Sequence, residues 1–319
     1  MLFREIRVKA QALHLWLPKF PFDLSLLENY VAPMQKGNAS TFDSPRVRFV
    51  MRMPVPQFFS NFLGRKIFRF LLTIHGLGAF ALITIGVMIK KFGVARRVMK
   101  PLIFHEISRS GVQLLPMFLF LSGALGLLVI GQTVSWATRF GATKYLGPVM
   151  VLVVVRELGP LISALFVLAR IGTANVVELG TSRATGEVEA LESLGIDPVH
   201  YLVVPRVFGM AIGIFSLTVY LIIGALASGY LWAFLQDVPL RPGDYFTQLA
   251  NSLTALDFVT LGVKTVLFGF IIAIVTCYHG LAQPLRLEEV SYATVRAVAQ
   301  SVIACVLIDA LFIVIYLMG

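Results

Sequence analysis

The stretch Leu146–Arg170 reads LGPVMVLVVVRELGPLISALFVLAR, and it decides the class of fold. About 20 consecutive apolar residues suffice for a helix to cross the roughly 30 Å hydrocarbon core of a bilayer. This stretch is longer than that, and between its ends only Arg156 and Glu157 are charged. It therefore predicts a transmembrane α-helix that carries two charges at bilayer depth.

Similar apolar stretches lie on both sides of this segment. Of the 319 residues, 57% are hydrophobic and only 14% are charged, whereas a soluble domain has roughly 25% charged residues. This composition excludes a soluble globular domain and predicts an all-α integral membrane protein. The other apolar stretches are 67–89, 112–131, 202–235, 258–281 and 297–318.

The first stretch, 67–89, differs from the others in its flanks. Residues 1–66 contain 10 Lys and Arg, and residues 90–109 contain six. A spanning helix has its basic residues mainly on the cytoplasmic side. Two basic flanks therefore predict an interfacial or re-entrant N-terminal helix, followed by five transmembrane helices.

The basic residues also predict the topology of those five helices. If 90–109 is inside, then 171–201 and 282–296 are inside too, and these segments hold nine Lys and Arg. The outer segments, 132–145 and 236–257, hold three. This bias follows the positive-inside rule for a multi-pass membrane protein.

The N-terminal third of the chain is strongly basic. Residues 1–109 contain 17 Lys and Arg against 5 Asp and Glu, which favours contact with anionic lipid. No nucleic-acid recognition motif accompanies the charge, so nucleic acid is not an expected partner. We expect residues 1–64 to be a cytoplasmic or surface extension, whose role the sequence does not indicate. The two cysteines, Cys277 and Cys305, exclude a disulfide framework.

The inner segment 171–201 contains a short amphipathic helix. Its apolar residues fall on one helical face and its acids on much of the rest, and Gly195 and Pro198 end it. The apolar face is formed by Val188, Leu191, Leu194 and Gly195, and the acids are Glu187, Glu189 and Glu192. We expect a cytoplasmic coupling helix within the region of about 176–200.

The intramembrane run Arg156-Glu157-Leu158-Gly159-Pro160 is the strongest candidate for a functional site. Arg156 and Glu157 are neighbours, so they point about 100° apart and do not pair with each other. Pro160 has no N–H, which leaves the Arg156 carbonyl without its helical donor. Such features favour a cavity, and a structural polar network between helices is the alternative.

Other polar and small residues lie in the apolar stretches. Gln132 is a further candidate cavity residue, Asp309 an anchor for helix packing, and Lys264 is expected to snorkel toward the interface. Gly209-x-x-x-Gly213 permits close helix packing, within one chain or between two.

Enzyme signatures are missing. His105-Glu106 lacks the second histidine of a zinc-protease helix because Arg109 stands in its place. The sequence has no Gly-Lys-Ser or Gly-Lys-Thr triplet and hence no P-loop. The chain is not expected to be an enzyme, and uphill transport would take its energy from a partner or an ion gradient.

Several motifs in order resemble those of the MlaE-type ABC transporter permeases, the membrane subunits of lipid transporters that work with MCE-domain proteins. The resemblance covers about 65–319, which we take as the permease domain, and 156–198 is its most specific part. The motifs are Arg156-Glu157-Leu158-Gly159-Pro160, Arg170-x-Gly172, Glu178-Leu179-Gly180-x-x-Arg183-Ala184-Thr185, Leu194-Gly195-x-Asp197-Pro198 and Val290-Ser291-x-Ala293-Thr294.

The resemblance implies an ABC permease that moves phospholipid between the inner membrane and a periplasmic MCE-domain partner. It implies a homodimer that holds two ATPase subunits, with ATP and Mg²⁺ in the ATPase and no cofactor on this chain. Arg156 and Glu157 match the family's polar pair near a lipid cavity. The residues that match the ATPase-coupling region are Glu178, Arg183, Glu187, Val188, Leu191, Glu192, Leu194 and Asp197.

The chain departs from the family pattern at two places. Gly186 follows the Arg-Ala-Thr run and is expected to loosen the helix by up to about 1 kcal/mol, and residues 281–289 lack the family's glycine-rich loop. Two other functions stay open. One is an ion-coupled secondary transporter that uses Arg156, Glu157 and Asp309, and the other is an intramembrane enzyme that uses Glu157.

Overall fold

The computed structural model describes residues 75–90, 96–141, 146–235, 242–281 and 286–318. Within these ranges the backbone is helical apart from short turns, and no strand occurs. All of them belong to the second of two compact units, which begins at Leu71. The expected extension, residues 1–64, lies outside the described residues.

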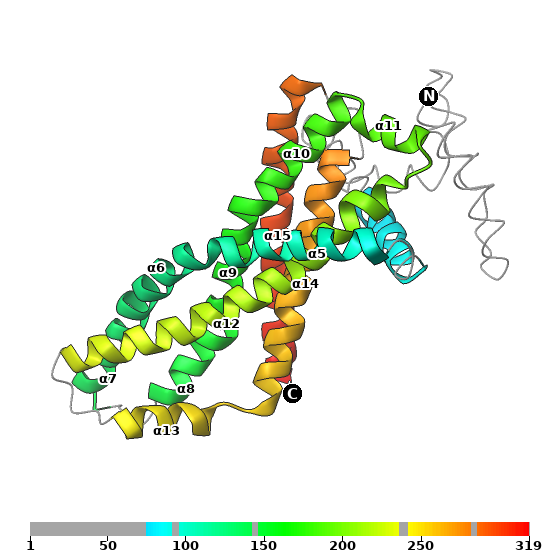
Figure 1. Cartoon of the computed structure of the whole chain (residues 1–319). Helices are drawn as coiled ribbons and strands as arrows, with labels where there is room; N and C mark the ends of the chain where they lie inside the picture. Colours follow the sequence, from blue (N-terminus) through cyan, green and yellow to red (C-terminus); the bar gives the residue numbers. More distant parts are fainter. Residues whose placement is uncertain (1–74, 91–95, 142–145, 236–241, 282–285, 319) are drawn as a thin grey trace, which may run out of the picture. The chain divides into compact units, whose positions relative to one another are not determined.

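Five of the described helical segments are long and apolar enough to cross a membrane, which confirms the predicted all-α membrane fold (Figure 1). The first has 43 residues and the second 38, far more than the roughly 20 that a crossing needs. Parts of both therefore extend beyond one crossing. The segments are Arg97–Arg139, Gly147–Ala184, Val199–Trp232, Ala255–Leu281 and Leu287–Tyr316.

The stretch expected at 67–89 is described from His75, as the short apolar helix His75–Lys90. Sixteen residues rise about 24 Å, less than the roughly 30 Å of the hydrocarbon core. The length of the described helix agrees with an interfacial or re-entrant segment, and whether it crosses stays a prediction.

The first long segment is interrupted near its start. Helix α5 (Arg96–Ser110) is followed by Gly111 and a 3₁₀ turn, and only then does α6 (Leu115–Leu125) begin. π-Helical residues Gly126–Ile130 then lead into α7 (Gly131–Arg139). The break at Gly111 separates α5 from the apolar stretch that the sequence predicts as a span.

The second segment carries the Arg-Glu-Leu-Gly-Pro run on widened turns. Helix α8 (Leu146–Met150) passes into π-helical residues Val151–Leu158, where Gly159 N–H donates to Val154 O, and α9 (Gly159–Val167) follows. Pro160 cannot supply the N–H that an α-helical Arg156 carbonyl needs, and a π-turn directly before it accommodates that loss.

After a second π-turn the same segment ends in α10 (Thr173–Ala184), which is followed by α11 (Glu187–Ser193), the expected coupling helix. Gly186 joins them with a φ of +82°, and Gly195 ends α11 with a φ of +76°, as the sequence predicts for Gly195. The expectation that Gly186 loosens a helix is wrong. It lies between two helices in a left-handed conformation that other residues adopt at a cost.

Helix α12 (Val204–Leu235) packs against α5, α6, α9 and α14. The small residues on α12 permit this closeness. Gly209 lies against Glu106 and Gly213 against Ser110, and Ser110 Oγ donates a 2.6 Å hydrogen bond to the Gly209 carbonyl. The Gly-x-x-x-Gly pattern therefore serves packing within this chain.

Helix α13 (Pro242–Ser252) lies in a segment that the sequence predicts only as an outer loop. It packs on α8, and Tyr245 is buried with its hydroxyl donating to the Leu226 carbonyl at 3.3 Å. Burial raises the pKa of Tyr245 to about 12, so the phenol stays protonated. The signal for this helix was the apolar pair Tyr245 and Leu249, four residues apart.

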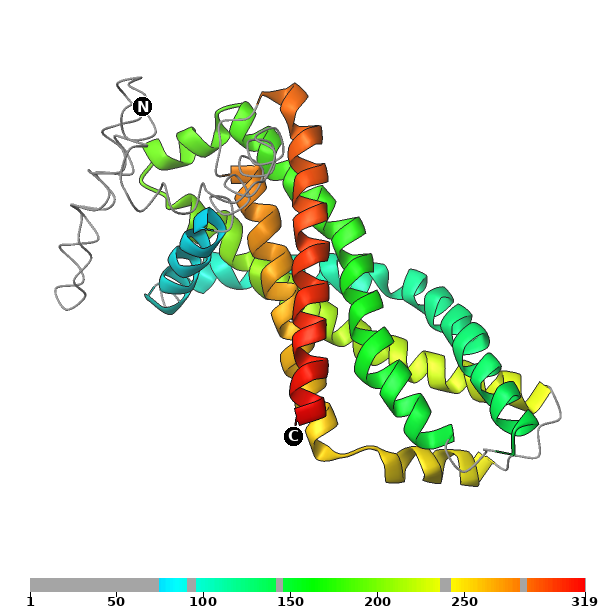
Figure 2. The same ribbon diagram turned by 180° about the vertical axis from the view of Figure 1, so that it is seen from behind.

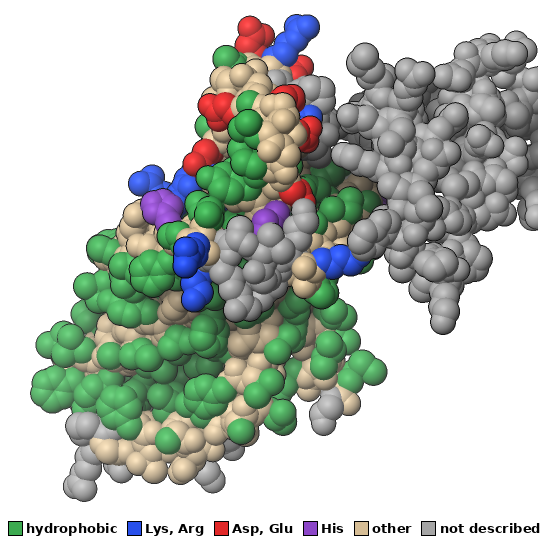
Figure 3. Space-filling model, turned by 45° about the vertical axis from the view of Figure 1, so that its right-hand side comes forward, with side chains coloured by type: hydrophobic (Ala, Val, Ile, Leu, Met, Phe, Trp, Pro, Cys, Tyr) green, Lys and Arg blue, Asp and Glu red, His purple; other side chains and the backbone are tan. Residues whose placement is uncertain are grey.

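The last two spans are α14 (Ala255–Leu281) and α15 (Val290–Met318), which pack along each other (Figure 2). Many side chains along α14 are buried, whereas α15 exposes Val295, Val306 and Leu307. On the face drawn in Figure 3, hydrophobic side chains cover the body and charged ones gather toward one end. That distribution suits a helical bundle surrounded by lipid.

Candidate functional site

Arg156 pairs with the start of α14. Its Nε lies 2.7 Å from Asp257 Oδ1, and its guanidinium carbon lies 4.2 Å from the ring centre of Tyr316. Asp257 also accepts hydrogen bonds from the backbone and hydroxyl of Thr254, at 2.9 and 2.8 Å. The arginine therefore links the second span to the last two by a charge pair and a cation–π contact.

Glu157 points to a different partner, as the helical spacing predicts. Its Oε2 lies 3.0 Å from Lys264 Nζ, and Lys264 also pairs with Asp309 of α15 at 2.5 Å. The expected snorkelling of Lys264 is wrong, because its side chain is only 2% exposed. The ion pairs of Lys264 with two carboxylates stabilise its ammonium group more than solvation at the interface would. Asp309 joins α15 to α14 in this way, as the sequence predicts for a packing anchor.

These five ionisable residues form an intramembrane ion-pair cluster of Arg156, Glu157, Asp257, Lys264 and Asp309. It joins the second span to both α14 and α15. Buried ion pairs contribute little net stability, but loss of one partner costs about 3–5 kcal/mol. The cluster fixes the relative positions of three spans, which is the structural alternative stated for the Arg-Glu pair.

Gln132 does not join this cluster. It lies on α7 with an exposed side chain, and the described residues show no contact between it and Arg156 or Glu157. Its assignment to a lipid cavity stays a prediction. Among the described residues, no group of three or more His, Cys, Asp or Glu side chains is arranged to hold a metal ion.

The coupling helix α11 rests on the bundle with only part of its apolar face. Val188 is 2% exposed and Leu191 is half-buried, whereas Leu194 is 75% exposed just after the helix ends. Ile196 is exposed beside it. The residues at the far end of α11 thus present an apolar surface that the described part of the chain leaves exposed.

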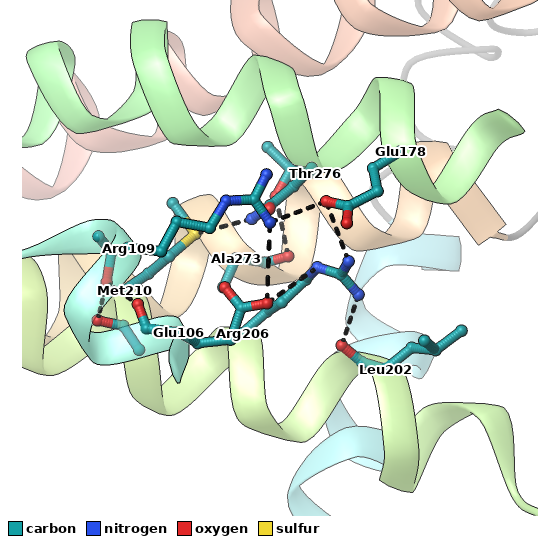
Figure 4. Close-up of polar contacts among 11 residues, drawn as sticks. Glu106, Arg109, Glu178, Leu202, Arg206, Met210, Ala273 and Thr276 are labelled. Atoms are coloured by element: carbon teal, nitrogen blue, oxygen red, sulfur yellow. Dashed lines mark hydrogen bonds and ion pairs between the residues drawn. The ribbon is translucent and has the colours of Figure 1, made fainter. Parts of the chain in front are cut away.

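The acids of the coupling region separate into two groups. Glu187 and Glu192 are exposed, and Glu189 lies 3.3 Å from Arg183 Nε, which fastens α11 to α10. Glu178 instead pairs with arginines of two other helices. Its Oε2 lies 2.8 Å from Arg109 Nη1 on α5 and 3.2 Å from Arg206 Nη2 on α12 (Figure 4).

Asp197 has a local structural task. Its Oδ1 accepts a 3.0 Å hydrogen bond from the backbone N–H of Val199, at the start of the π-helical residues Val199–Val203 that lead into α12. Such side-chain acceptors satisfy N–H groups that a helix start leaves free. Asp197 therefore sets the turn by which the chain returns from α11 to the membrane.

Sequence reasoning missed three important charged residues. Asp257 lay one residue outside the apolar stretch 258–281, Arg206 lay inside 202–235, and Arg109 was counted only as a basic flank. A charge inside an apolar stretch was the signal for Arg206, because such residues normally have partners. No signal in the sequence identified the partners themselves.

The segments assigned to one side of the membrane also meet in space. Arg109 from 90–109 and Glu178 from 171–201 form the 2.8 Å pair, and Leu287–Glu289 contacts α10. On the other side, α13 packs on α8, with Gln248 close to Gly147. This agreement supports the topology derived from the basic residues.

Comparison with known proteins agrees with this architecture. A probable ABC transporter permease protein of Rickettsia typhi is 31% identical over 242 residues, which cover 76% of this chain and 91% of that protein. The intermembrane phospholipid transport system permease protein MlaE of Haemophilus influenzae is 27% identical over 248 residues, with coverage of 76% and 91%. The chloroplastic protein TRIGALACTOSYLDIACYLGLYCEROL 1 of Arabidopsis thaliana is 29% identical over 207 residues, covering 64% of this chain and 58% of that protein.

The family model described as Permease MlaE matches residues 103–315, which include nearly all of the five candidate spans. It also includes the ion-pair cluster and the coupling region. With its five apolar helices, the chain is a multi-pass protein of the inner membrane and an ABC transporter permease. It belongs to the MlaE permease family.

Proposed function

We propose that this permease moves phospholipid between the inner membrane and a periplasmic MCE-domain protein. In this proposal it works as a homodimer with two ATPase subunits, which bind ATP and Mg²⁺, and it binds no cofactor of its own. The permease domain comprises residues 65–319. Two relatives support a lipid as substrate, since their names refer to phospholipid transport and to a galactolipid.

The observation that carries the ATPase proposal is the coupling helix. Leu194 and Ile196 are exposed at the C-terminal end of α11, and the same helix carries the exposed acids Glu187 and Glu192. The N-terminal end of α11 is held by buried Val188 and by the pair between Arg183 and Glu189. An apolar surface on a helix that is firmly attached to the bundle suits the docking of a partner whose motion must reach the membrane helices.

Binding of a lipid headgroup by Arg156 would require the arginine to give up its ion pair with Asp257. Its guanidinium already pairs with Asp257, so a phosphate group would compete with that carboxylate. Arginine binds phosphate with paired donors, which makes the exchange chemically reasonable. We propose that Arg156 and Glu157 lie beside the lipid path, with Gln132 on the same path, and that Asp257 holds the arginine when lipid is absent.

The test uses the full-length tagged chain, purified from native membranes with its bound proteins and lipids. Mass spectrometry is expected to identify an ABC ATPase, an MCE-domain protein and phospholipid. Lipid transfer by the reconstituted complex is expected to require ATP. An ion-coupled transporter would instead purify without an ATPase and respond to an ion gradient, and that result would refute the proposal.

A further inference from the structure

Three helices meet at the carboxylate of Glu178. It comes from α10, Arg109 comes from α5 and Arg206 from α12, and one oxygen of Glu178 receives both arginines at 2.8 and 3.2 Å (Figure 4). A second acid, Glu106 of α5, lies near the same two arginines, at 3.9 Å from each. We call these four residues the cytoplasmic ion cluster, and their formal charges sum to zero.

Two of the three helices form a tight unit. Gly209 of α12 lies against Glu106 of α5, and Ser110 Oγ donates to the Gly209 carbonyl at 2.6 Å. Arg206 is only 7% exposed and donates to the Leu202 carbonyl at 2.9 Å, so its guanidinium is held by its own helix. Arg206, Arg109 and Glu106 therefore stay together when α5 and α12 move as one.

Helix α10 is attached differently. It packs mainly along α14 and α15, and its connections to α12 and α5 are made by side chains: the Glu178 pairs, and a 3.4 Å contact from Asn175 to the sulfur of Met210. Glu178 is 47% exposed, so this connection is open to water. A displacement of α10 relative to α5 and α12 would break these ion pairs.

The geometry around Glu106 supplies a second set of partners. Arg206 Nε is buried and makes no hydrogen bond within the described residues, and Glu106 Oε1 lies 3.9 Å from it. At that distance an ion pair exists without a hydrogen bond. A shift of about 1 Å would complete the hydrogen bond.

We propose that Glu178 and Glu106 exchange as partners of Arg109 and Arg206 when α10 and α11 move. This rests on the proposed function, in which an ATPase drives α11. While Glu178 holds both arginines, α10 is joined to α5 and α12. When α10 withdraws, Glu106 remains the acidic neighbour of both guanidiniums and offsets one of their two positive charges, while water solvates the half-exposed Glu178. Glu178 and Glu106 are positioning residues of a two-state joint.

The first experiment compares Glu106→Gln and Glu178→Gln in the purified complex, with Glu288→Gln as the control. Glu288 is an exposed acid on Leu287–Glu289, outside the cytoplasmic ion cluster. Both cluster variants are expected to retain the ATPase and ATP hydrolysis but to lose about tenfold in lipid transfer, a typical size for coupling between sites. The control is expected to match the parent. Unchanged transfer by Glu106→Gln would overturn the proposal.

A purely structural cluster gives another pattern, in which thermal stability, ATP hydrolysis and transfer fall together. That pattern would also overturn the exchange. If the parent complex binds no ATPase or transfers no lipid, the proposed function fails instead, so the two failures are distinguishable.

A second measurement follows the distance between α5 and α10 directly. Spin labels are placed at exposed Lys100 of α5 and Thr181 of α10, in a background where Cys277 and Cys305 are alanine. The exchange predicts two distances whose proportions change when ATP is trapped, and Glu106→Gln should shift the balance toward the Glu178-paired distance. A single distance that ATP leaves unchanged would refute the proposal.

Discussion

Lys264 Nζ lies 2.9 Å from the carbonyl oxygen of Arg156, the carbonyl from which Pro160 withholds the N–H four residues on. The lysine thus supplies the donor that the proline removes, and it pairs with Glu157 and Asp309 through the same ammonium group. One buried ammonium group therefore contacts a backbone carbonyl without a helical donor and two acidic side chains. The charged run in the second span is stable because of this residue, 108 positions away.

Replacement of Lys264 is therefore expected to be strongly destabilising. Lys264→Met leaves Glu157, Asp309 and a backbone carbonyl without their donor, which costs about 3–5 kcal/mol. A lower thermal midpoint of the detergent-purified protein would show the loss. Lys264→Met combined with Asp309→Asn should recover part of it, because one unpaired acid is removed. An unchanged midpoint for Lys264→Met would contradict the role of the lysine.

Competition between Asp257 and lipid phosphate predicts opposite effects of two variants. Arg156→Ala should lower the phospholipid bound per protomer, Arg156→Lys should retain part of it, and Asp257→Asn should raise it by freeing the guanidinium. The measurement is phosphorus per protein in monodisperse samples. Equal lipid content in all of these variants would argue that Arg156 is only a structural link between spans.

The exposed residues at the C-terminal end of α11 should bind the ATPase. Leu194→Asp places a charge in a docked apolar contact and is expected to reduce recovery of the ATPase with the tagged permease, while the permease still inserts. Leu287→Asp is a matched control, since Leu287 is a similarly exposed leucine, 63% against 75% for Leu194. Full recovery of the ATPase with Leu194→Asp would place the contact elsewhere.

Gly186 should be sensitive to substitution although it has space around it. An added Cβ would meet no atom within 4 Å, but the φ of +82° is unfavourable for alanine by roughly 1–2 kcal/mol. Gly186→Ala is expected to lower the thermal midpoint. Gly123→Ala is the control, because Gly123 is equally open and lies in α6 with an ordinary helical φ. If both variants behave alike, backbone strain at Gly186 is not the cause.

The interfacial assignment of the first apolar helix can be tested by thiol labelling. Single cysteines at Ser40 and Lys100, in a background without Cys277 and Cys305, should both be protected from an impermeant reagent added to the periplasmic side. Protection is expected because both flanks of the helix are basic and hence cytoplasmic. Labelling at position 40 alone would show that the helix spans the membrane.

Local rules explain which features could be predicted from the sequence. The end of α11 followed from Gly195, whose φ of +76° is observed, and the disturbed helix at Arg156 followed from Pro160. Lys264 was assigned wrongly, because snorkelling is judged from one side chain and its stem. The two carboxylates that hold it lie on other helices, and nothing in the neighbouring sequence indicates them.

The sequence by itself determined the membrane class and the five long apolar helices. The cost of inserting a helix is a sum over about 20 consecutive residues, so it can be read along the chain. Only the tertiary structure decided the ion pairs, such as Arg156 with Asp257, Glu157 with Lys264, and Glu178 with Arg206. An ion pair needs two groups within 4 Å, and helix packing brings together residues that are far apart in sequence.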